Sequence, residues 1–536
     1  MSSNPRVLFL GADACDADLV TRWAAAGDLP YFARLLHTSL RARTQGPAGI
    51  FGGSLWPTFV TGMSPGRHRL YCYNQYSPLS YADEPFLPAR LAEEPFWLRL
   101  DRAGRRVGVL DVPLTPITSV VNGFHVAEWG IHDLAGPRAR FSSSSVGLEV
   151  ARVAGVAPVR DCEGNRLTAG EFMHLRDSLM QQAQRRTDLA AHFLGQAHWD
   201  FFACVFGESH CAGHQMWHIH DPSHPNHIPK VARQLGGDPL LDVYRAIDRG
   251  IATLASHADE DTIIIVWCSH GMGPHYDATF LLDAVLQRLE DPRRAASPAA
   301  GLGAARRLWR CIPFTWRRKL GRVPLAILRR AETRRIAADR RRRRFFAVSD
   351  NNEQGAIRIN LIGRDAHGRV PPGAEYEEVL AYLREALLEL ENVETGEPVV
   401  TGFQYPQTLH RGPYANDLPD MTVEWNRSRP IRKIRSPRVG VIEGTSPTTR
   451  TGDHKPEGLL FVLHPGVPAG ELDRIIDAID LAPTIASLLG VPHEGFDGRP
   501  VPEILVSSGL FAEGSSTSGG PPHGPGACSR GPHGCV

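Results

Sequence analysis

Short apolar runs alternate with longer helix-period stretches along this chain, and this alternation limits the fold more than any other feature of the sequence. The apolar runs have the length and composition of buried β-strands and cover residues 7–10, 107–110, 201–206, 263–267, 357–362 and 459–463. The helix-period stretches cover residues 169–194, 240–255, 376–390 and 472–489. Because strands that alternate with helices build parallel sheets, we expect an α/β fold in which helices sandwich a central, mainly parallel sheet.

The length of 536 residues suits one large domain with cap insertions, or two domains. We expect the first part of the α/β core in residues 1–280, with cap elements at about 63–190, and the second part in residues 346–510. Between them, residues 281–345 are expected to form a basic insertion or cap. Residues 511–536 are rich in Gly, Pro and Ser, so we expect a disordered tail there.

The formal net charge of +1 conceals one strongly basic segment. Residues 306–344 hold 16 basic residues against only Glu332 and Asp339, so the rest of the chain is acidic. An acidic body is unsuited to general nucleic-acid binding, and we expect no specific nucleic-acid partner. The segment interleaves Trp309 and Trp316 with arginine, which is typical of a helix on an anionic membrane. A solvated cap that gates the substrate is an equal alternative.

The cysteine pattern and the N-terminus both indicate a reducing compartment. The nine cysteines have no regular spacing, and their odd number argues against an extracellular disulfide framework. The first residues lack the longer apolar region of a secretory signal, and no stretch is long and apolar enough to span a bilayer. We therefore expect a cytoplasmic protein.

Metal-capable side chains follow three of the predicted strands. They are Asp13 after the first strand, Glu208, His210 and His214 after the third, and Ser269 and His270 after the fourth. Ligands gather at the carboxyl ends of the strands in sheets of this kind. Because His and Asp are borderline ligands suited to zinc or a similar transition metal, the sequence predicts a metal site at this edge.

Four motifs carry these residues in a fixed order across almost the whole folded chain. They are VLFLGADACDADLV with Asp13, GGSLWPTFVTGMSPGRHRLY, GESHCAGHQMW with His210 and His214, and the pair CSHGMGP and TGDHKPEG with His270 and His454. In this order they resemble the alkaline phosphatase superfamily, and most closely its type I phosphodiesterase and nucleotide pyrophosphatase branch. The resemblance implies a metal-dependent hydrolase that acts on a small phosphate ester, a phosphodiester or a nucleotide pyrophosphate.

The resemblance also implies a set of metal ligands, from which this chain departs at two positions. The implied ligands are Asp13, His210, His214, Ser269, His270 and His454. His210 and Ser269 stand where the family pattern has aspartates, so two anionic ligands are missing. We expect a three-histidine site with an open position. A second site around Asp13 and His270 should bind metal more weakly, unless Glu208, Asp277 or Asp453 compensates. The expected cofactor is one or two divalent ions, zinc first and manganese as the alternative.

The nucleophile departs from the family pattern as well. The family register places the catalytic hydroxyl at Gly52, which has none. Ser54 is the predicted nucleophile, as the N-cap of a helix that begins at Leu55 with Pro57 in its first turn. A hydroxyl at a helix N-terminus that faces a metal is positioned and acidified for attack. Thr58 is the reserve.

Blander interpretations stand beside these. Taken alone, Asp13 fits the role of a helix cap as well as that of a metal ligand. Ser54 also fits a purely structural role as an N-cap, and we expect His68 to order its turn. From His218 onward, the histidine run is expected to be a solvated loop. A sulfatase is excluded, because CIPFT at Cys311, the nearest approach to the sulfatase motif, lies in the basic segment and lacks its arginine.

The predicted reaction is attack of Ser54 on phosphorus to give a covalent intermediate that water resolves. Competing enzymes are a phosphonate or phosphomonoester hydrolase and a phosphotransferase. A competitor from another class is a catalytically degenerate protein that binds an anion or a membrane, and the missing aspartates and Gly52 keep it open.

Overall fold

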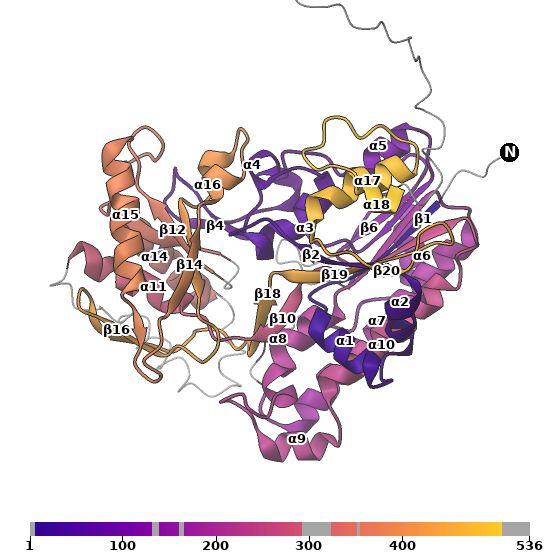
Figure 1. Ribbon diagram of the computed structural model, residues 1–536, viewed down its shortest axis with the longest axis horizontal. Coiled ribbons are helices and arrows are strands. Elements are labelled where there is room, and N and C mark those ends of the chain that lie inside the picture. The colour runs from indigo at the N-terminus through magenta and orange to yellow at the C-terminus, as the bar shows by residue number, and fades with distance from the viewer. Residues whose placement is uncertain are drawn as a thin grey trace, which may run out of the picture.

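A computed structural model describes residues 6–130, 139–159, 164, 166–291, 323–350 and 354–505. A large sheet with helices on both faces forms its centre, which confirms the expected α/β class (Figure 1). The strands lie in the order β20 (Gly470–Glu471), β2 (Leu40–Gln45), β19 (Glu457–Leu463), β9 (Thr262–Cys268), β1 (Arg6–Ala12), β8 (Phe201–Phe206), β5 (Val107–Leu110), β6 (Gly123–Ala127) and β7 (Arg140–Phe141), and β21 (Ile476–Asp477) also pairs with β2. The neighbouring strands β9, β1, β8, β5 and β6 are all parallel.

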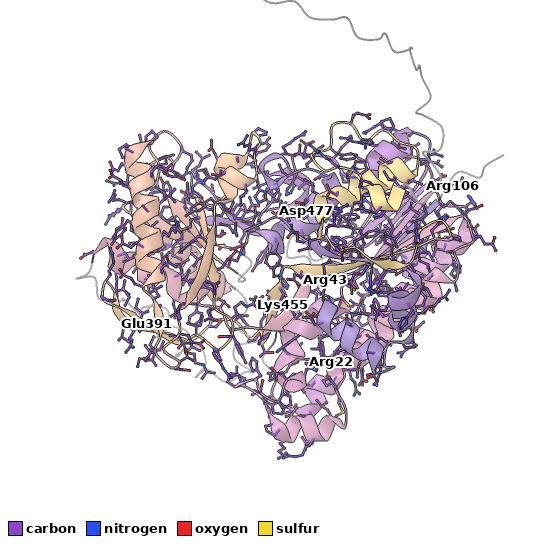
Figure 2. The ribbon with its side chains drawn as sticks, viewed as in Figure 1. Arg22, Arg43, Arg106, Glu391, Lys455 and Asp477 are labelled. Atoms are coloured by element: carbon purple, nitrogen blue, oxygen red, sulfur yellow. The ribbon has the colours of Figure 1, made fainter. Side chains whose placement is uncertain are left out.

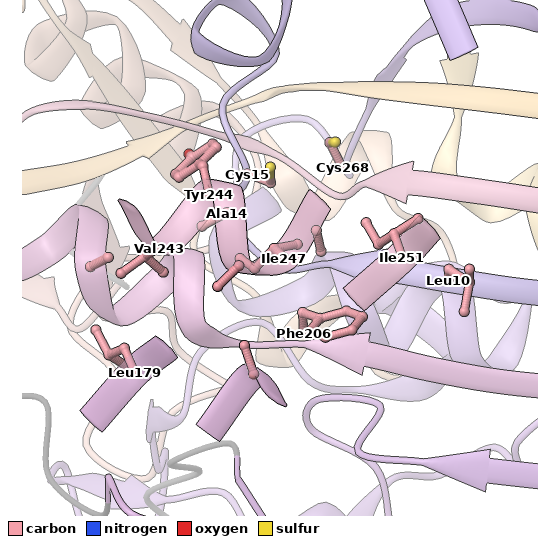
Figure 3. Packing of buried hydrophobic residues seen from close by; sticks show 14 of the residues in the cluster. Leu10, Ala14, Cys15, Leu179, Phe206, Val243, Tyr244, Ile247, Ile251 and Cys268 are labelled. Carbon is pink, nitrogen blue, oxygen red and sulfur yellow. The ribbon is translucent and has the colours of Figure 1, made fainter. Parts of the chain in front are cut away.

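Successive side chains of β1 enter two hydrophobic cores, because neighbouring residues of a strand point to opposite faces. Leu8 and Leu10 face one core and Phe9 faces the other. The first core lies under α1 (Ala17–Ala25), α2 (Pro30–Thr38), α7 (Ala169–Gln196), α8 (Glu208–His220) and α10 (Pro239–Ala255), and the second under α3 (Phe51–Thr61), α5 (Trp97–Arg102), α17 (Leu481–Leu488) and α18 (Pro502–Leu505). Figure 3 shows Phe206 and Ile251 of the first core beside Leu10.

Two apolar runs that were expected to be parallel strands of the central sheet form antiparallel strands instead. The run at 357–362 corresponds to β12 (Gly355–Ile359), which is antiparallel to both of its neighbours in a second sheet. The run at 459–463 is β19, which lies in the central sheet but antiparallel to β9 and β2. An apolar run shows that a strand is buried and does not encode its direction. The predicted helix at 472–489 is α-helical only in α17, which a single 3-10 turn (Ala478–Asp480) precedes, because Ile476 and Asp477 pair with β2 as the short strand β21.

The second sheet belongs to a lobe with its own core. It has the order β11 (Phe345–Val348), β12, β15 (Met421–Trp425) and β14 (Val400–Gln404), and α11 (Thr279–Glu290) and α15 (Ala374–Leu388) share its core. A small sheet of β13 (Glu391–Asn392), β16 (Lys433–Ser436) and β17 (Gly440–Glu443) adjoins it. The predicted domain boundaries remain predictions, although this core groups residues that the sequence divides between an insertion and the main core.

The described end of the basic segment forms ion pairs within the protein. In α14 (Val323–Arg340) Arg340 pairs with Asp83 at 3.0 Å, and beyond it Arg343 pairs with Asp283 at 2.7 Å. Residues 292–322 of the predicted insertion and the predicted tail at 511–536 lie outside the described residues. Contact with an anionic membrane therefore stays a prediction. Among the described helices, none combines the length and apolar character needed to cross a bilayer.

One edge of the central sheet collects the ends of several strands. The parallel strands β1, β8 and β9 all end there, and the antiparallel strand β19 begins there. Directly before β19, the short strand β18 (Gly452–Lys455) pairs antiparallel with β10 (Gly271–Pro274), which follows β9. Figure 1 shows β10, β18 and α8 together between the two lobes. The residues predicted as metal ligands are thus brought to one place.

Candidate metal centre

Three histidines from two elements form the centre of the site. His210 and His214 lie one turn apart on one face of α8, and His454 comes from β18. Each offers one nitrogen, and these nitrogens all lie within 4.8 Å of one another. The ring centroids are 4.5 to 5.0 Å apart. His214 and His454 are buried, whereas His210 is half-buried and gives the cluster an open side.

Backbone contacts between α8 and β18 hold the cluster together. Nδ1 of His214 lies 2.8 Å from the carbonyl oxygen of Gly452 and must donate to it, which leaves Nε2 to face a metal. The N–H of Thr451 in turn donates to the carbonyl oxygen of His214 at 2.8 Å. A Cβ at Gly452 would lie 2.3 Å from the carbonyl oxygen of Gly213, so this close approach requires a glycine.

The chemistry of these side chains fits a divalent transition metal. Burial lowers the pKa of His454 well below its ordinary value, and the neighbouring imidazoles of His270 and His214 lower it further. His454 is therefore neutral at physiological pH and presents a lone pair. Three neutral imidazoles suit zinc and leave one position open, as catalytic zinc sites require.

The second predicted site centres on Asp13 and differs in character. Oδ1 of Asp13 accepts hydrogen bonds from Trp56 Nε1 at 2.7 Å and from Ser269 Oγ at 3.2 Å, and His270 Nε2 lies 3.5 Å away. Burial raises the pKa of Asp13, but the hydrogen bond from His270 and the nearby His210 outweigh it, and the pKa lies below its ordinary value. Asp13 is therefore an anion whose oxygen already has donors, which fits a tightly bound second cation poorly.

Trp56 is the residue of this site that the sequence reasoning missed. Its indole N–H reaches Asp13 from α3, and its ring packs against Trp267 and Phe59. The available signal was its spacing: Trp56 follows Gly52 by four residues, so the two share one face of the helix. The helix face on which the family carries its nucleophile thus carries the indole N–H of Trp56 in this protein.

Other residues considered as ligands or caps have different partners. Asp16 caps α1, with its Oδ1 accepting from Leu19 N at 2.9 Å, so Asp13 is not the cap of that helix. Glu208 accepts from the fully buried Arg186 at 3.0 Å and does not replace a missing ligand. Asp277 and Asp453 group with His275 in a separate cluster.

The helix that carries the predicted nucleophile begins earlier than expected. α3 begins at Phe51, and the N–H of Ser54 already donates to the carbonyl oxygen of Ile50, so the prediction that Ser54 caps a helix at Leu55 is wrong. A glycine is required at 53, where the chain at Tyr71 passes close to the helix, because a Cβ there would lie 2.1 Å from the carbonyl oxygen of Tyr71.

The hydroxyl of Ser54 lies against the turn that follows α3. It is fully buried and donates to the carbonyl oxygen of Leu70 at 2.7 Å. At 100° per residue, Ser54 stands about 160° around the helix axis from Trp56, which reaches Asp13. Ser54 as nucleophile stays a prediction, and it requires this hydrogen bond to be exchanged.

Thr58 lies one turn after Ser54 and contacts His68. Leu70 N donates to His68 Nδ1 at 3.1 Å, so the proton of this neutral imidazole sits on Nε2 and is donated to Thr58 Oγ1 at 3.0 Å. Burial lowers the pKa of His68 to about 3. His68 orders the turn in this arrangement, and its Nε2 has no lone pair with which to take a proton from Thr58.

A cavity of about 250 Å³ adjoins the edge of the sheet beside this centre and is lined by Asp16, Asp18, Arg43, Lys455 and three further residues. Figure 2 shows Lys455 and Arg43 near one another at this edge. Lys455 Nζ pairs with Asp16 at 2.7 Å and with Asp18 at 3.1 Å. Because its cations are matched by carboxylates, the cavity offers little net positive charge to an anionic substrate.

One family of known proteins matches the motifs. The family model described as type I phosphodiesterase/nucleotide pyrophosphatase matches residues 7–456, which include all the predicted site residues. No curated protein matches the chain. Human ectonucleotide pyrophosphatase/phosphodiesterase 5 is a similar structure with 12% identity and a TM-score of 0.44, and the alignment covers 92% of this chain and 97% of that one. Phosphonoacetate hydrolase from Sinorhizobium meliloti 1021, in complex with phosphonoformate, is similar with 12% identity, a TM-score of 0.49, and coverage of 91% and 95%.

Proposed function

Because the chain belongs to the type I phosphodiesterase/nucleotide pyrophosphatase family of hydrolytic enzymes, we propose that it hydrolyses a small phosphate ester at a divalent metal ion held by His210, His214 and His454. The observation that carries this proposal is the convergence of three histidine nitrogens within 4.8 Å of one another. A phosphodiester or pyrophosphate is the favoured substrate class on family membership alone. A phosphonate or phosphomonoester hydrolase and a phosphotransferase are the alternatives within the same chemistry.

The donor set supports zinc as the metal, with manganese as the alternative. When bound, a zinc ion supplies a Lewis acid for a phosphoryl oxygen. The residues of the chain supply the rest: His214 is fixed by Gly452, and the half-buried His210 marks the side from which a substrate reaches the cluster. Asp13 and His270 are proposed as a weaker second site, since Trp56 and Ser269 donate to the same oxygen of Asp13.

For the attacking group we retain Ser54, with Thr58 as the reserve. Support for Ser54 is its place in the first turn of α3, where the positive end of the helix dipole stabilises an anion. The covalent route requires Ser54 to exchange its hydrogen bond with Leu70 for one with the substrate. Direct attack by water is the alternative, and it requires no such exchange.

A substrate panel with matched variants tests the proposal. Chromogenic monoesters, diesters and a phosphonate are assayed with the metal-loaded and the chelated protein. We expect turnover of at least one substrate to need metal, and the double variant His210→Ala, His214→Ala to lose both metal and turnover. His37→Ala is the control, because His37 is exposed and lies outside the cluster. Undiminished turnover in the double variant, or in chelated protein, would contradict the proposal, and a metal-loaded protein without turnover would favour the degenerate binding protein.

A further inference from the structure

A second cluster of metal-capable side chains lies on the far side of the β10–β18 ribbon. It consists of His275, Asp277 and Asp453, whose ligand atoms all lie within 4.8 Å of one another. The ribbon brings them together, since Gly273 pairs with Asp453 and the N–H of His275 donates to the carbonyl oxygen of Thr451 at 3.0 Å. The three side chains are 6%, 2% and 0% exposed.

This cluster is separate from the three histidines. Asp453 and His454 are adjacent in β18, and successive side chains of a strand point to opposite faces. His454 therefore faces the histidine cluster, and Asp453 faces away from it. Arg427 donates to the carbonyl oxygens of Pro274 and His454 and so joins the two strands of the ribbon.

Each side chain of the second cluster is held by a backbone group through the atom that does not face its centre. His275 Nδ1 donates to the carbonyl oxygen of Arg450 at 3.2 Å. One oxygen of Asp277 accepts from Thr279 N at 2.8 Å, and one oxygen of Asp453 accepts from His454 N at 3.0 Å. Fixing the outer atoms in this way orients the inner atoms, which is how proteins arrange ligands around a metal.

The inner atoms are left with too few donors. His275 Nε2 contacts Asp277 Oδ2 and lies 3.7 Å from Asp453 Oδ2. Among the described residues, Asp453 Oδ2 has no hydrogen-bond partner although it is fully buried. A buried carboxylate oxygen without a donor is costly, and one imidazole nitrogen does not satisfy two carboxylates.

We propose that His275, Asp277 and Asp453 bind a divalent first-row transition metal ion through His275 Nε2 and the two Oδ2 atoms. One nitrogen and two carboxylate oxygens are ligands for zinc or manganese. The site does not rest on the proposed hydrolysis, because it lies on the other face of β18. The ion would fix β18 from behind and so help to hold His454 in place.

Counting metal ions in the full-length protein tests this site with the histidine cluster disabled. After chelation, the protein is reloaded with Mn²⁺ or Zn²⁺, and the bound metal is measured by mass spectrometry. We expect the variant His210→Ala, His214→Ala to keep one tightly bound ion, and the further changes Asp277→Asn and Asp453→Asn to remove it. Asp13→Asn in the same background is the matched control and should keep the ion, because Asp13 lies beside His270 and not in this cluster.

Two results would overturn the site: no metal bound after the histidines are removed, or undiminished metal after Asp277→Asn and Asp453→Asn. If those asparagine variants fail to fold, the single variant His275→Gln in otherwise unchanged protein decides. It should lower the number of bound ions by one and abolish the corresponding metal-dependent rise in melting temperature. An unchanged count would show that the cluster is an ion pair of His275 with two carboxylates and holds no metal.

Discussion

At the scale of single residues, the site differs from the family pattern because neutral side chains stand where the family has anionic ligands. His210 turns one set of ligands into three neutral imidazoles, while Ser269 and Trp56 surround Asp13 with neutral donors. The sequence predicted the first change, because His210 falls within a recognisable motif. It predicted Ser269 in the same way. It did not predict the contact of Trp56, since a tryptophan in an apolar helix is usually a core residue and its contact with Asp13 joins residues 43 positions apart.

Removing the indole N–H should strengthen the second site. Trp56→Phe keeps an aromatic ring against Trp267 and frees one hydrogen-bonding position on Asp13 Oδ1. We expect metal titration of chelated protein to show tighter binding at Asp13 and His270, with the three-histidine site unchanged. Trp267→Phe is the control, because its N–H donates to Thr44 instead. Identical metal affinities in Trp56→Phe and the unaltered protein would refute this role.

The nucleophile is tested by two hydroxyl deletions on one helix. If Ser54 attacks, Ser54→Ala should lower turnover by orders of magnitude with metal content intact. Thr58→Ala should be mild, because Thr58 lies about one helical turn, roughly 6 Å, further along α3. Trapping with a slow substrate and mapping the modified peptide separates the cases. Label on Thr58 would show that Thr58 is the nucleophile. Full activity of Ser54→Ala would instead indicate that water is the attacking group.

At the scale of elements, the sequence predicted strands and helices better than their directions and partners. The runs at 107–110 and 201–206 coincide with β5 and β8, and the ligands His210 and His214 follow the end of β8. The antiparallel course of β19 and the ribbon of β10 and β18 depend on pairings between segments about 180 residues apart, which no local pattern encodes. That ribbon creates the cluster of His275, Asp277 and Asp453, so the cluster was visible only in the structure.

The first residue of α8 anchors the helix that carries two metal ligands. Glu208 pairs with Arg186, which also pairs with Asp111, and all three side chains are fully buried. Arg186→Gln removes the cation that both carboxylates share, leaves Glu208 and Asp111 buried without it, and should lower the free energy of unfolding by about 3–5 kcal/mol, as measured by urea denaturation. Glu503→Gln, in a partly exposed pair with Arg474, should cost less than about 1 kcal/mol. Equal losses in the two variants would contradict the structural role of the buried network.

At the scale of the whole molecule, several histidines are buried in uncharged form, and this sets the response to acid. His218 lies buried in α8, so the expectation of a solvated loop from His218 onward is wrong for this residue. Burial lowers the pKa of His68 and His125 to about 3 and that of His218 to about 4. The unfolded chain takes up these protons near pH 6.5 and the folded chain does not, so stability falls as the pH drops below that value. His275 acts in the opposite direction: although burial lowers its pKa, the hydrogen bond with Asp277 raises it to about 9.

The net effect is a measurable loss of stability in mild acid. Each neutral histidine contributes a loss of about 1.4 kcal/mol between pH 7.5 and 5.5, and His275 offsets about one of the three. His224 and His454, whose pKa values burial also lowers, add to this loss. We therefore expect the free energy of unfolding of chelated protein to fall by at least about 3 kcal/mol over this range. His125→Gln should reduce the fall. A stability that is constant or rises between pH 7.5 and 5.5 would show that these imidazoles are not held neutral.

Titration of chelated protein with zinc, while turnover of a chromogenic phosphodiester or monoester is followed, tests the central claim most directly. The account predicts that the rate of turnover rises as zinc fills the site of His210, His214 and His454. The double variant His210→Ala, His214→Ala should show no such rise at any zinc concentration at which it remains folded. A rate that is already complete before zinc is added, or that rises equally in the double variant, would contradict it.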